Sequence, residues 1–118
     1  MKRLISIIII SLGFLPLMAQ NDYYIRQAQS YQREAEYYTK QALGYEREVA
    51  YYNQQAQSYL RETEYYSKRK NYDRVRTYQQ RAQNATDKAE NYAEKARSAR
   101  ERAQDYMKKA EYALKRAK

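Results

Sequence analysis

The chain contains no cysteine, no histidine and no tryptophan, and it has only two glycines and one proline in 118 residues. Without cysteine, neither a disulfide framework nor a lipid-bearing cysteine can form. Without histidine, cysteine or a glycine-rich loop, the sequence lacks the usual nucleophile and base pairs, soft metal ligands and phosphate-binding loops. The sequence therefore predicts a protein that is not an enzyme, and it nominates no catalytic, metal-binding or cofactor-binding residue.

A long hydrophobic run occurs only near the start of the chain, in residues 4–17, where two basic residues precede it. This order is typical of a secretory signal peptide, and we expect residues 1–19 to be removed after Ala19. An uncleaved membrane anchor is the alternative. A membrane span needs about 20 apolar residues, and Gly13 and Pro16 interrupt this shorter run. We therefore expect an exported protein, periplasmic or extracellular, with no transmembrane span after cleavage.

The composition of the whole chain is narrow and basic. Sixteen tyrosines stand beside a single phenylalanine, and 23 lysines and arginines outnumber 14 acidic residues. Most other residues are strong helix formers such as alanine, glutamine and glutamate, which is the composition of a long helix. Disorder is the alternative because charge is high and few residues are strongly apolar. The regular spacing described next argues against disorder.

Residues 23–64 consist of a 14-residue repeat, YYIRQAQSYQREAE, YYTKQALGYEREVA and YYNQQAQSYLRETE. Fourteen residues are two heptads, and alternating steps of four and three create one seam of a left-handed coiled coil. A second seam of the same spacing runs from Val75 to Ala117. The first seam comprises Tyr24, Ala28, Tyr31, Ala35, Tyr38, Ala42, Tyr45, Val49, Tyr52, Ala56, Tyr59, Thr63 and Tyr66.

The two seams are out of phase, which predicts a break between them at Lys70 and Asn71. We expect a first long helix over 20–69, a turn over 70–73 and a second long helix over 74–118. Asn71 suits the left-handed conformation beyond a helix end, and Asp73 suits the cap of the next helix. The fold class is therefore all-α, a long antiparallel helical hairpin with an Ala/Tyr heptad seam. A single continuous helix paired antiparallel with a second copy is the alternative.

A hairpin that turns at this point pairs the two seams layer by layer. Each tyrosine of the second seam then lies opposite a small or β-branched residue of the first, so that no tyrosine directly faces another. These layers pair Ala35 with Tyr106, Val49 with Tyr92 and Thr63 with Tyr78.

Charges beside the seam favour the same orientation. One edge places glutamates and glutamines of the first helix against lysines and arginines of the second, predicting ion pairs worth about 0.2 to 1 kcal/mol each. The opposite edge brings Ile25 near Leu114 and Gln32 near Met107 and is mostly uncharged, which favours self-association there. The first helix contributes Gln27, Glu34, Gln41, Glu48, Gln55 and Glu62 to the charged edge, and the second contributes Arg81, Lys88, Lys95, Arg102, Lys109 and Arg116.

Two rows on the outer surface of the first helix are candidate interaction surfaces. The first, Tyr23, Tyr37, Tyr51 and Tyr65, could form an aromatic ladder for carbohydrate or a partner helix. The alternative is that these rings lie over the stems of second-helix lysines and arginines. The second row, Arg26, Arg33, Lys40, Arg47, Arg61 and Lys68, could bind an acidic glycan or a lipid headgroup. Its alternative is a solvated face, and nucleic acid is disfavoured as a partner after export.

The sequence thus favours an exported, non-enzymatic coiled-coil protein of a bacterial cell envelope with a structural or protein-interaction role. Self-association or another envelope protein is the expected partner. The alternative is a helical module of periplasmic chaperone type, or one that binds an anionic polymer. The basic, hairpin-like character is similar to the arms of periplasmic chaperones that cradle unfolded outer-membrane proteins, although no motif transfers a site.

Overall fold

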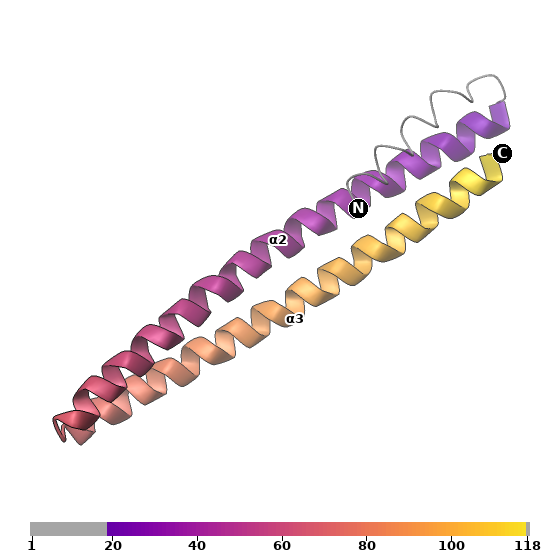
Figure 1. Cartoon of the computed structure of the whole chain (residues 1–118). Helices are drawn as coiled ribbons and strands as arrows, with labels where there is room; N and C mark the ends of the chain where they lie inside the picture. Colours follow the sequence, from indigo (N-terminus) through magenta and orange to yellow (C-terminus); the bar gives the residue numbers. More distant parts are fainter. Residues whose placement is uncertain (1–18, 118) are drawn as a thin grey trace. The chain divides into compact units, whose positions relative to one another are not determined.

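The computed structural model describes residues 19–117 and is an all-α helical hairpin, as predicted (Figure 1). Helix α2 spans Ala19–Lys68 and helix α3 spans Tyr72–Ala117. Both begin slightly earlier than expected, so the turn is confined to residues 69–71. The expected signal peptide, apart from its last residue, lies outside the described residues. Within the described residues, neither helix has a segment apolar and long enough to cross a membrane.

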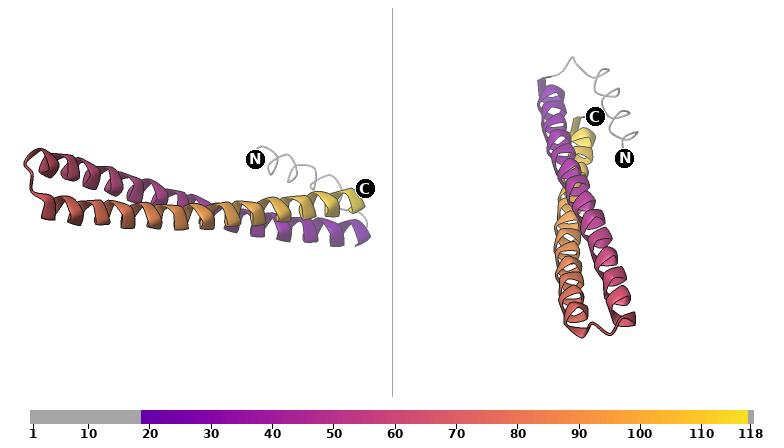
Figure 2. Two further views of the ribbon diagram at one scale, coloured as in Figure 1. Left: turned by 90° about the horizontal axis from the view of Figure 1, so that it is seen from below. Right: turned by 90° about the vertical axis from the view of Figure 1, so that its left-hand side faces the viewer.

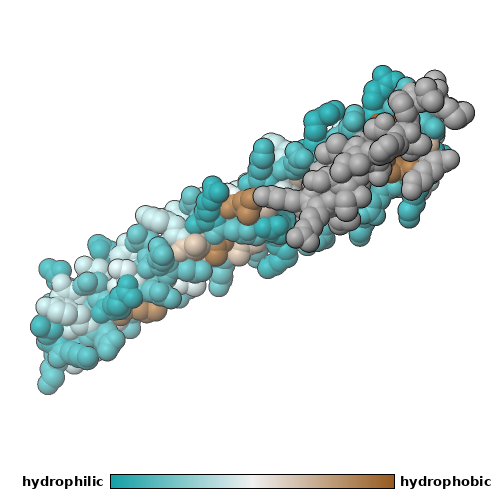
Figure 3. All heavy atoms as spheres, turned by 45° about the horizontal axis from the view of Figure 1, so that its top comes forward, coloured by the Kyte–Doolittle hydropathy of each residue, from teal (hydrophilic) through white to brown (hydrophobic). Residues whose placement is uncertain are grey.

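The described chain divides into two compact units. In each unit a stretch of α2 lies beside a stretch of α3, and the ribbons of both helices can be followed in Figure 2. We call residues 19–40 with 99–117 the terminal unit, and residues 41–98, which include the turn, the turn unit. The buried residues are almost all alanines, and none of the large side chains that the structure describes is fully buried. The face shown in Figure 3 is mainly hydrophilic, with small separate hydrophobic areas. Each unit is therefore held by a thin alanine core flanked by half-buried tyrosines.

The turn ends α2 with a left-handed residue and starts α3 with a side-chain cap. The Asn71 amide donates to the Tyr66 carbonyl at 3.0 Å and the Lys70 amide to the Ser67 carbonyl at 3.1 Å. This pair of bonds is the Schellman motif, with Lys70 in the left-handed conformation at φ 59°. The next helix starts at once, because Asn71 Oδ1 accepts from the Arg74 amide at 3.4 Å.

The position of the turn was therefore predicted correctly, but the roles of its residues were not. Lys70, rather than Asn71, adopts the left-handed conformation. Asn71, rather than Asp73, caps α3, while Asp73 lies in the first helical turn and pairs with Arg76 at 2.7 Å. Asn71 can serve only one role, and its side-chain oxygen satisfies a free amide of α3 that no other side chain reaches in the described residues.

Three tyrosines of α3 each lie between two tyrosines of α2. In the terminal unit, the Tyr106 ring lies 6.1 Å from Tyr31 and 5.8 Å from Tyr38. In the turn unit, Tyr92 lies between Tyr45 and Tyr52, and Tyr78 between Tyr59 and Tyr66. We call each set of three a tyrosine triad. The turn-unit centroid distances are 6.0 and 5.8 Å for Tyr92 and 6.1 and 5.6 Å for Tyr78.

The triads confirm the predicted register and correct one inference from it. Ala35 and Tyr106 belong to the same core cluster, as the layer pairing requires. Tyr38 follows Ala35 by three residues, about 4.5 Å along the helix, whereas Tyr31 precedes it by four, about 6 Å. Accordingly, the nearer ring stacks at an interplanar angle of 7° and the farther one is tilted at 33°. Tyrosines therefore avoid facing each other within a layer but contact each other between layers.

Candidate binding surface

Seven lysines and arginines of α3 lie over tyrosine rings. Arg74 of the first turn lies over Tyr66 at 5.2 Å, and the six that follow it form a row, with three of the six in each unit. Lys88 lies over Tyr52 at 5.4 Å and Arg102 over Tyr38 at 5.5 Å, so these contacts join the two helices. Others are made within α3, such as Lys95 over Tyr92 at 5.2 Å. We call this row of side chains the tyrosine–cation edge. Its members are Arg81, Lys88, Lys95, Arg102, Lys109 and Arg116, all exposed at the surface.

The ion pairs predicted on this edge do not form. Among the described residues, none of the six cations has a carboxylate partner, and neither do the glutamates expected opposite them. The acidic row of α2 and the basic row of α3 were expected to meet, but no ion pair of the described residues joins them. The prediction of an acidic edge meeting a basic edge is therefore wrong in its contacts.

Tyrosine rings explain why these ion pairs do not form, because the rings lie between the glutamates of α2 and the cations of α3. An exposed ion pair is worth about 0.2 to 1 kcal/mol, and a cation over an aromatic face about 0.5 to 1 kcal/mol. The ion pair must also order two long side chains, whereas a half-buried ring is already held by its triad. The cations therefore pack on the rings and keep their charges directed to solvent.

The exposed tyrosines of the repeat lie beside this edge. Each contacts the next tyrosine in the sequence edge to face, as in Tyr51 and Tyr52 at 5.1 Å and 77°. The expectation that they lie under second-helix cations is wrong for Tyr51, because Lys88 covers Tyr52 instead. Tyr65 does carry a cation, but it is Arg69 of the turn, at 3.8 Å. The exposed fractions are 59% for Tyr23, 54% for Tyr37, 52% for Tyr51 and 47% for Tyr65.

The basic row of α2 is also exposed but is less uniform. Lys68 pairs with Glu64 at 3.3 Å, and Arg26 donates from Nε to the Asp22 carbonyl at 3.4 Å. These local contacts tie the ends of the row to its own helix. Arg33, Lys40, Arg47 and Arg61 remain exposed between them. This row is therefore separate from the six cations that lie over the rings.

A surface groove opens on the tyrosine–cation edge in each unit. One groove of the turn unit has a volume of about 410 Å³, and one of the terminal unit about 310 Å³. We call them the turn groove and the terminal groove. Neither lining contains a carboxylate. The turn groove is lined by Tyr51, Tyr52, Gln55, Tyr59, Arg81, Asn84, Ala85 and Lys88, and the terminal groove by Gln27, Tyr31, Lys108, Lys109, Tyr112, Ala113 and Arg116.

Comparison of the chain with protein-family models, with curated proteins and with solved structures finds no match. The geometry of this surface is therefore the basis for any function. The described residues also hold no group of three or more acidic side chains placed to share a metal ion. What the surface offers chemically is charge, phenol rings and amides.

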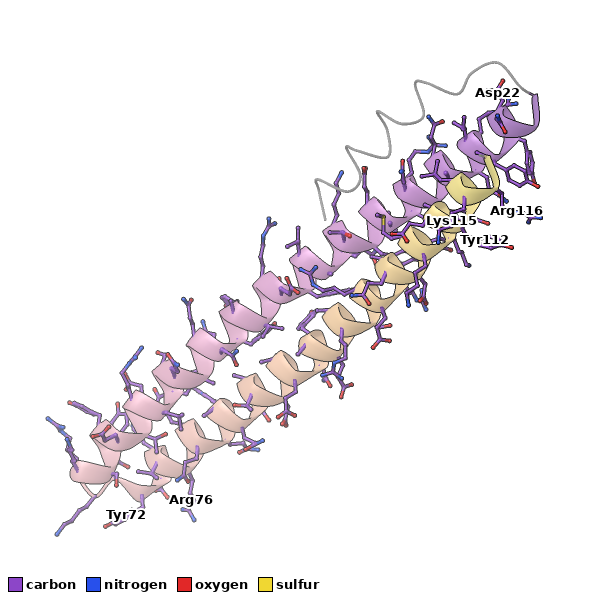
Figure 4. All side chains as sticks on the ribbon, turned by 45° about the vertical axis from the view of Figure 1, so that its right-hand side comes forward. Asp22, Tyr72, Arg76, Tyr112, Lys115 and Arg116 are labelled. Atoms are coloured by element: carbon purple, nitrogen blue, oxygen red, sulfur yellow. The ribbon has the colours of Figure 1, made fainter. Side chains whose placement is uncertain are left out.

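The two grooves are the feature that sequence reasoning missed. A signal was present, because a shift of four heptads relates Gln27 to Gln55, Tyr31 to Tyr59 and Ala113 to Ala85. The cations are also kept in position but change type, with Lys109 matching Arg81 and Arg116 matching Lys88. Predicting the grooves would have required the pairing register of the two helices and the position of the cations over the tyrosine rings. Figure 4 shows Tyr112 and Arg116 of the terminal groove in the last turns of α3.

Proposed function

We propose that this protein is an exported, non-enzymatic helical hairpin of a bacterial cell envelope that binds its partner through the tyrosine–cation edge. The observation that carries the proposal is the row of six cations that lie over rings without carboxylate partners. An unneutralised row of one sign raises the local concentration of anionic partners. The partner is therefore an anionic component of the envelope, such as an acidic surface of a protein, an acidic glycan or a lipid headgroup.

The aromatic row strengthens this proposal. Exposed tyrosines are amphipathic and lose little side-chain entropy on binding, which makes them frequent contact residues. In this chain, Tyr51 is half exposed and lines the turn groove together with Lys88. Aromatic and cationic groups thus occupy one continuous surface of the turn unit. Export is supported by the signal-like pattern of residues 1–19.

Cell fractionation tests the proposal directly. The protein is expressed in a bacterial host with a reporter that is active only after export, and its retention on washed envelopes is measured as NaCl is raised. We expect an active reporter and salt-sensitive retention. A triple substitution on the edge, Arg81→Gln, Lys88→Gln and Lys95→Gln, should weaken retention, with the remaining binding due to Arg102, Lys109 and Arg116. The matched control, Arg33→Gln, Arg47→Gln and Arg61→Gln, removes the same charge from the basic row of α2 and should be retained.

Three results would count against this function. An inactive reporter would contradict export. Equal loss of retention in both triple variants would show that net charge, rather than the edge, is responsible. If the protein co-purifies from the envelopes with a mixed set of unfolded polypeptides, and the edge variant does so equally well, the chaperone-like alternative is favoured. Sedimentation velocity on the same preparations tests self-association. Ile25 and Met107 of the mostly uncharged edge are already buried in the core of the terminal unit, so this edge offers less apolar surface for a second copy than the sequence predicted.

A further inference from the structure

We propose that the turn groove and the terminal groove are two copies of one subsite, each of which binds an acidic sugar of an anionic polysaccharide. This inference rests on the proposed function and names the ligand class. Its starting point is the repetition of residue types: each groove has one glutamine, a triad tyrosine, a buried alanine and two cations at matching positions. The 14-residue repeat also places a hollow of about 330 Å³ at the intervening position, but its lining has a carboxylate and no cation, so it does not share this set. That lining is Gln41, Gly44, Tyr45, Glu48 and Tyr92.

The cations of each groove are held in place before any ligand arrives. In the turn groove, Arg81 lies 5.2 Å over Tyr78 and Lys88 lies 5.4 Å over Tyr52. In the terminal groove, Lys109 lies 5.0 Å over Tyr106 and Arg116 lies 5.3 Å over Tyr24. A cation packed on a ring loses less freedom when an anion binds. Because no carboxylate lines either groove, the charge is available to a carboxylate or sulfate of the ligand.

The remaining groups of the lining suit a sugar. Gln55 and Asn84 project amides into the turn groove, and Tyr59 also lines it. Amides and phenol hydroxyls both donate and accept hydrogen bonds, as the hydroxyls of a sugar require. The floor is Ala85, only 5% exposed, and its small side chain keeps the groove open. A groove of about 410 Å³ is within the usual size range of a small-molecule site.

The arrangement favours a glycan over a single-stranded nucleic acid. Nucleic acids bind such surfaces by stacking bases on exposed aromatic faces. Here Lys88 covers the Tyr52 ring, and Tyr59 is tilted against Tyr78 in its triad. The ring with most exposure in this groove is Tyr51, which contacts Tyr52 edge to face. The groove therefore offers hydrogen-bonding groups and fixed charge rather than a stacking platform.

Isothermal titration of the purified protein tests the subsite with defined probes. The probes are an oligogalacturonate, which carries carboxylates, an oligomeric dextran sulfate, which carries sulfates, an uncharged dextran of similar length and a single-stranded oligonucleotide. We expect at least one acidic glycan to bind, the uncharged dextran not to bind, and binding to weaken as NaCl is raised. Which acidic glycan binds more tightly distinguishes carboxylate from sulfate recognition.

Two matched double variants decide whether the groove is responsible. Arg81→Gln with Lys88→Gln should weaken binding of the acidic glycan about tenfold or more at the turn groove, as expected for loss of charge-assisted hydrogen bonds. Arg47→Gln with Arg61→Gln removes the same charge from the same unit and should change binding by about twofold or less. Circular dichroism melts of both variants establish that they are folded at the titration temperature.

Each contrary result overturns the inference in a recognisable way. Equal weakening in the two double variants would mean diffuse charge attraction without a groove. Tight binding of the oligonucleotide with no binding of either acidic glycan would assign the edge to nucleic acid. If no probe binds while envelope retention remains sensitive to the edge substitutions, the glycan subsite is wrong and the proposed function stands. If retention also fails, both are wrong.

Discussion

Replacement of Tyr92 by alanine should be among the most destabilising single changes in the turn unit. Tyr92 is half buried between Tyr45 and Tyr52, with ring centroids at 6.0 and 5.8 Å. Two ring contacts contribute about 1 to 3 kcal/mol beyond the apolar area they bury. Removing the buried half of the ring adds about 2 kcal/mol. We therefore expect Tyr92→Ala to lower the free energy of unfolding by about 3 to 5 kcal/mol.

Two further variants separate the ring contacts from other effects. Tyr92→Phe keeps the ring and its stack and should cost less than about 1 kcal/mol. Tyr51→Ala removes a ring that is half exposed and has an edge contact with Tyr52 at 5.1 Å. That change should also cost less than about 1 kcal/mol, because the better helix propensity of alanine offsets part of the loss.

Urea unfolding followed by circular dichroism measures all three variants. The midpoint must not change with protein concentration, since self-association would otherwise contribute to the apparent stability. If Tyr92→Ala and Tyr51→Ala cost the same, the triads do not hold the helices together as described. If Tyr92→Phe costs as much as Tyr92→Ala, the phenol hydroxyl rather than the stacked ring carries the energy.

Three other predictions concern the turn, the charges and the core. Lys70→Gly should stabilise the protein by about 0.5 to 1 kcal/mol because Lys70 holds φ at 59°, and an unchanged or lower urea midpoint would contradict this reading of the turn. Glu62→Gln should change the free energy of unfolding by less than about 0.3 kcal/mol since no ion pair with Arg81 forms among the described residues, whereas a salt-dependent loss would revive the predicted pair. Gln32→Met should stabilise the protein by about 1 kcal/mol or more, because Gln32 is 4% exposed and its Nε2 has no hydrogen-bond partner in the described residues. Thermal unfolding measures this, and a lower melting temperature would show that the amide is hydrogen-bonded in solution.

The hairpin and its register could be predicted because they depend on periodicity alone. Steps of three and four place Ala35 and Tyr106 on facing stripes, and only one register closes the chain near Lys70. The roles of the turn residues could not be predicted. Asn71 suits both a left-handed position and a cap, and only the hydrogen bonds at Tyr66 and Arg74 show which role it takes.

The binding edge was predicted less well because side-chain alternatives of similar energy compete there. Lys95 could pair with Glu48 or lie over Tyr92, and both options are worth less than about 1 kcal/mol. Periodicity places all three residues on one edge but cannot choose between the contacts. Whether Lys95 contacts the glutamate or the ring depends on how far the tyrosine ring extends beyond the seam. That distance is set by side-chain packing in three dimensions. The grooves depend on which of these contacts the cations make, so the repeat pattern could not predict them either.

The preference for tyrosine over phenylalanine in the seam links stability to binding. The ring of a seam tyrosine packs in the triad while its hydroxyl reaches the surface of the hairpin. There the Tyr38 hydroxyl accepts a hydrogen bond from Arg102 at 3.5 Å, and the Tyr66 hydroxyl accepts one from Arg74 at 3.4 Å. Loss of a triad ring would therefore both weaken the packing of α2 against α3 and remove the ring on which a cation lies. A binding defect in such a variant could not be assigned to the surface. Substituting the cations avoids this ambiguity, since Lys88→Gln leaves the ring of Tyr52 stacked on Tyr92 while removing the charge above it.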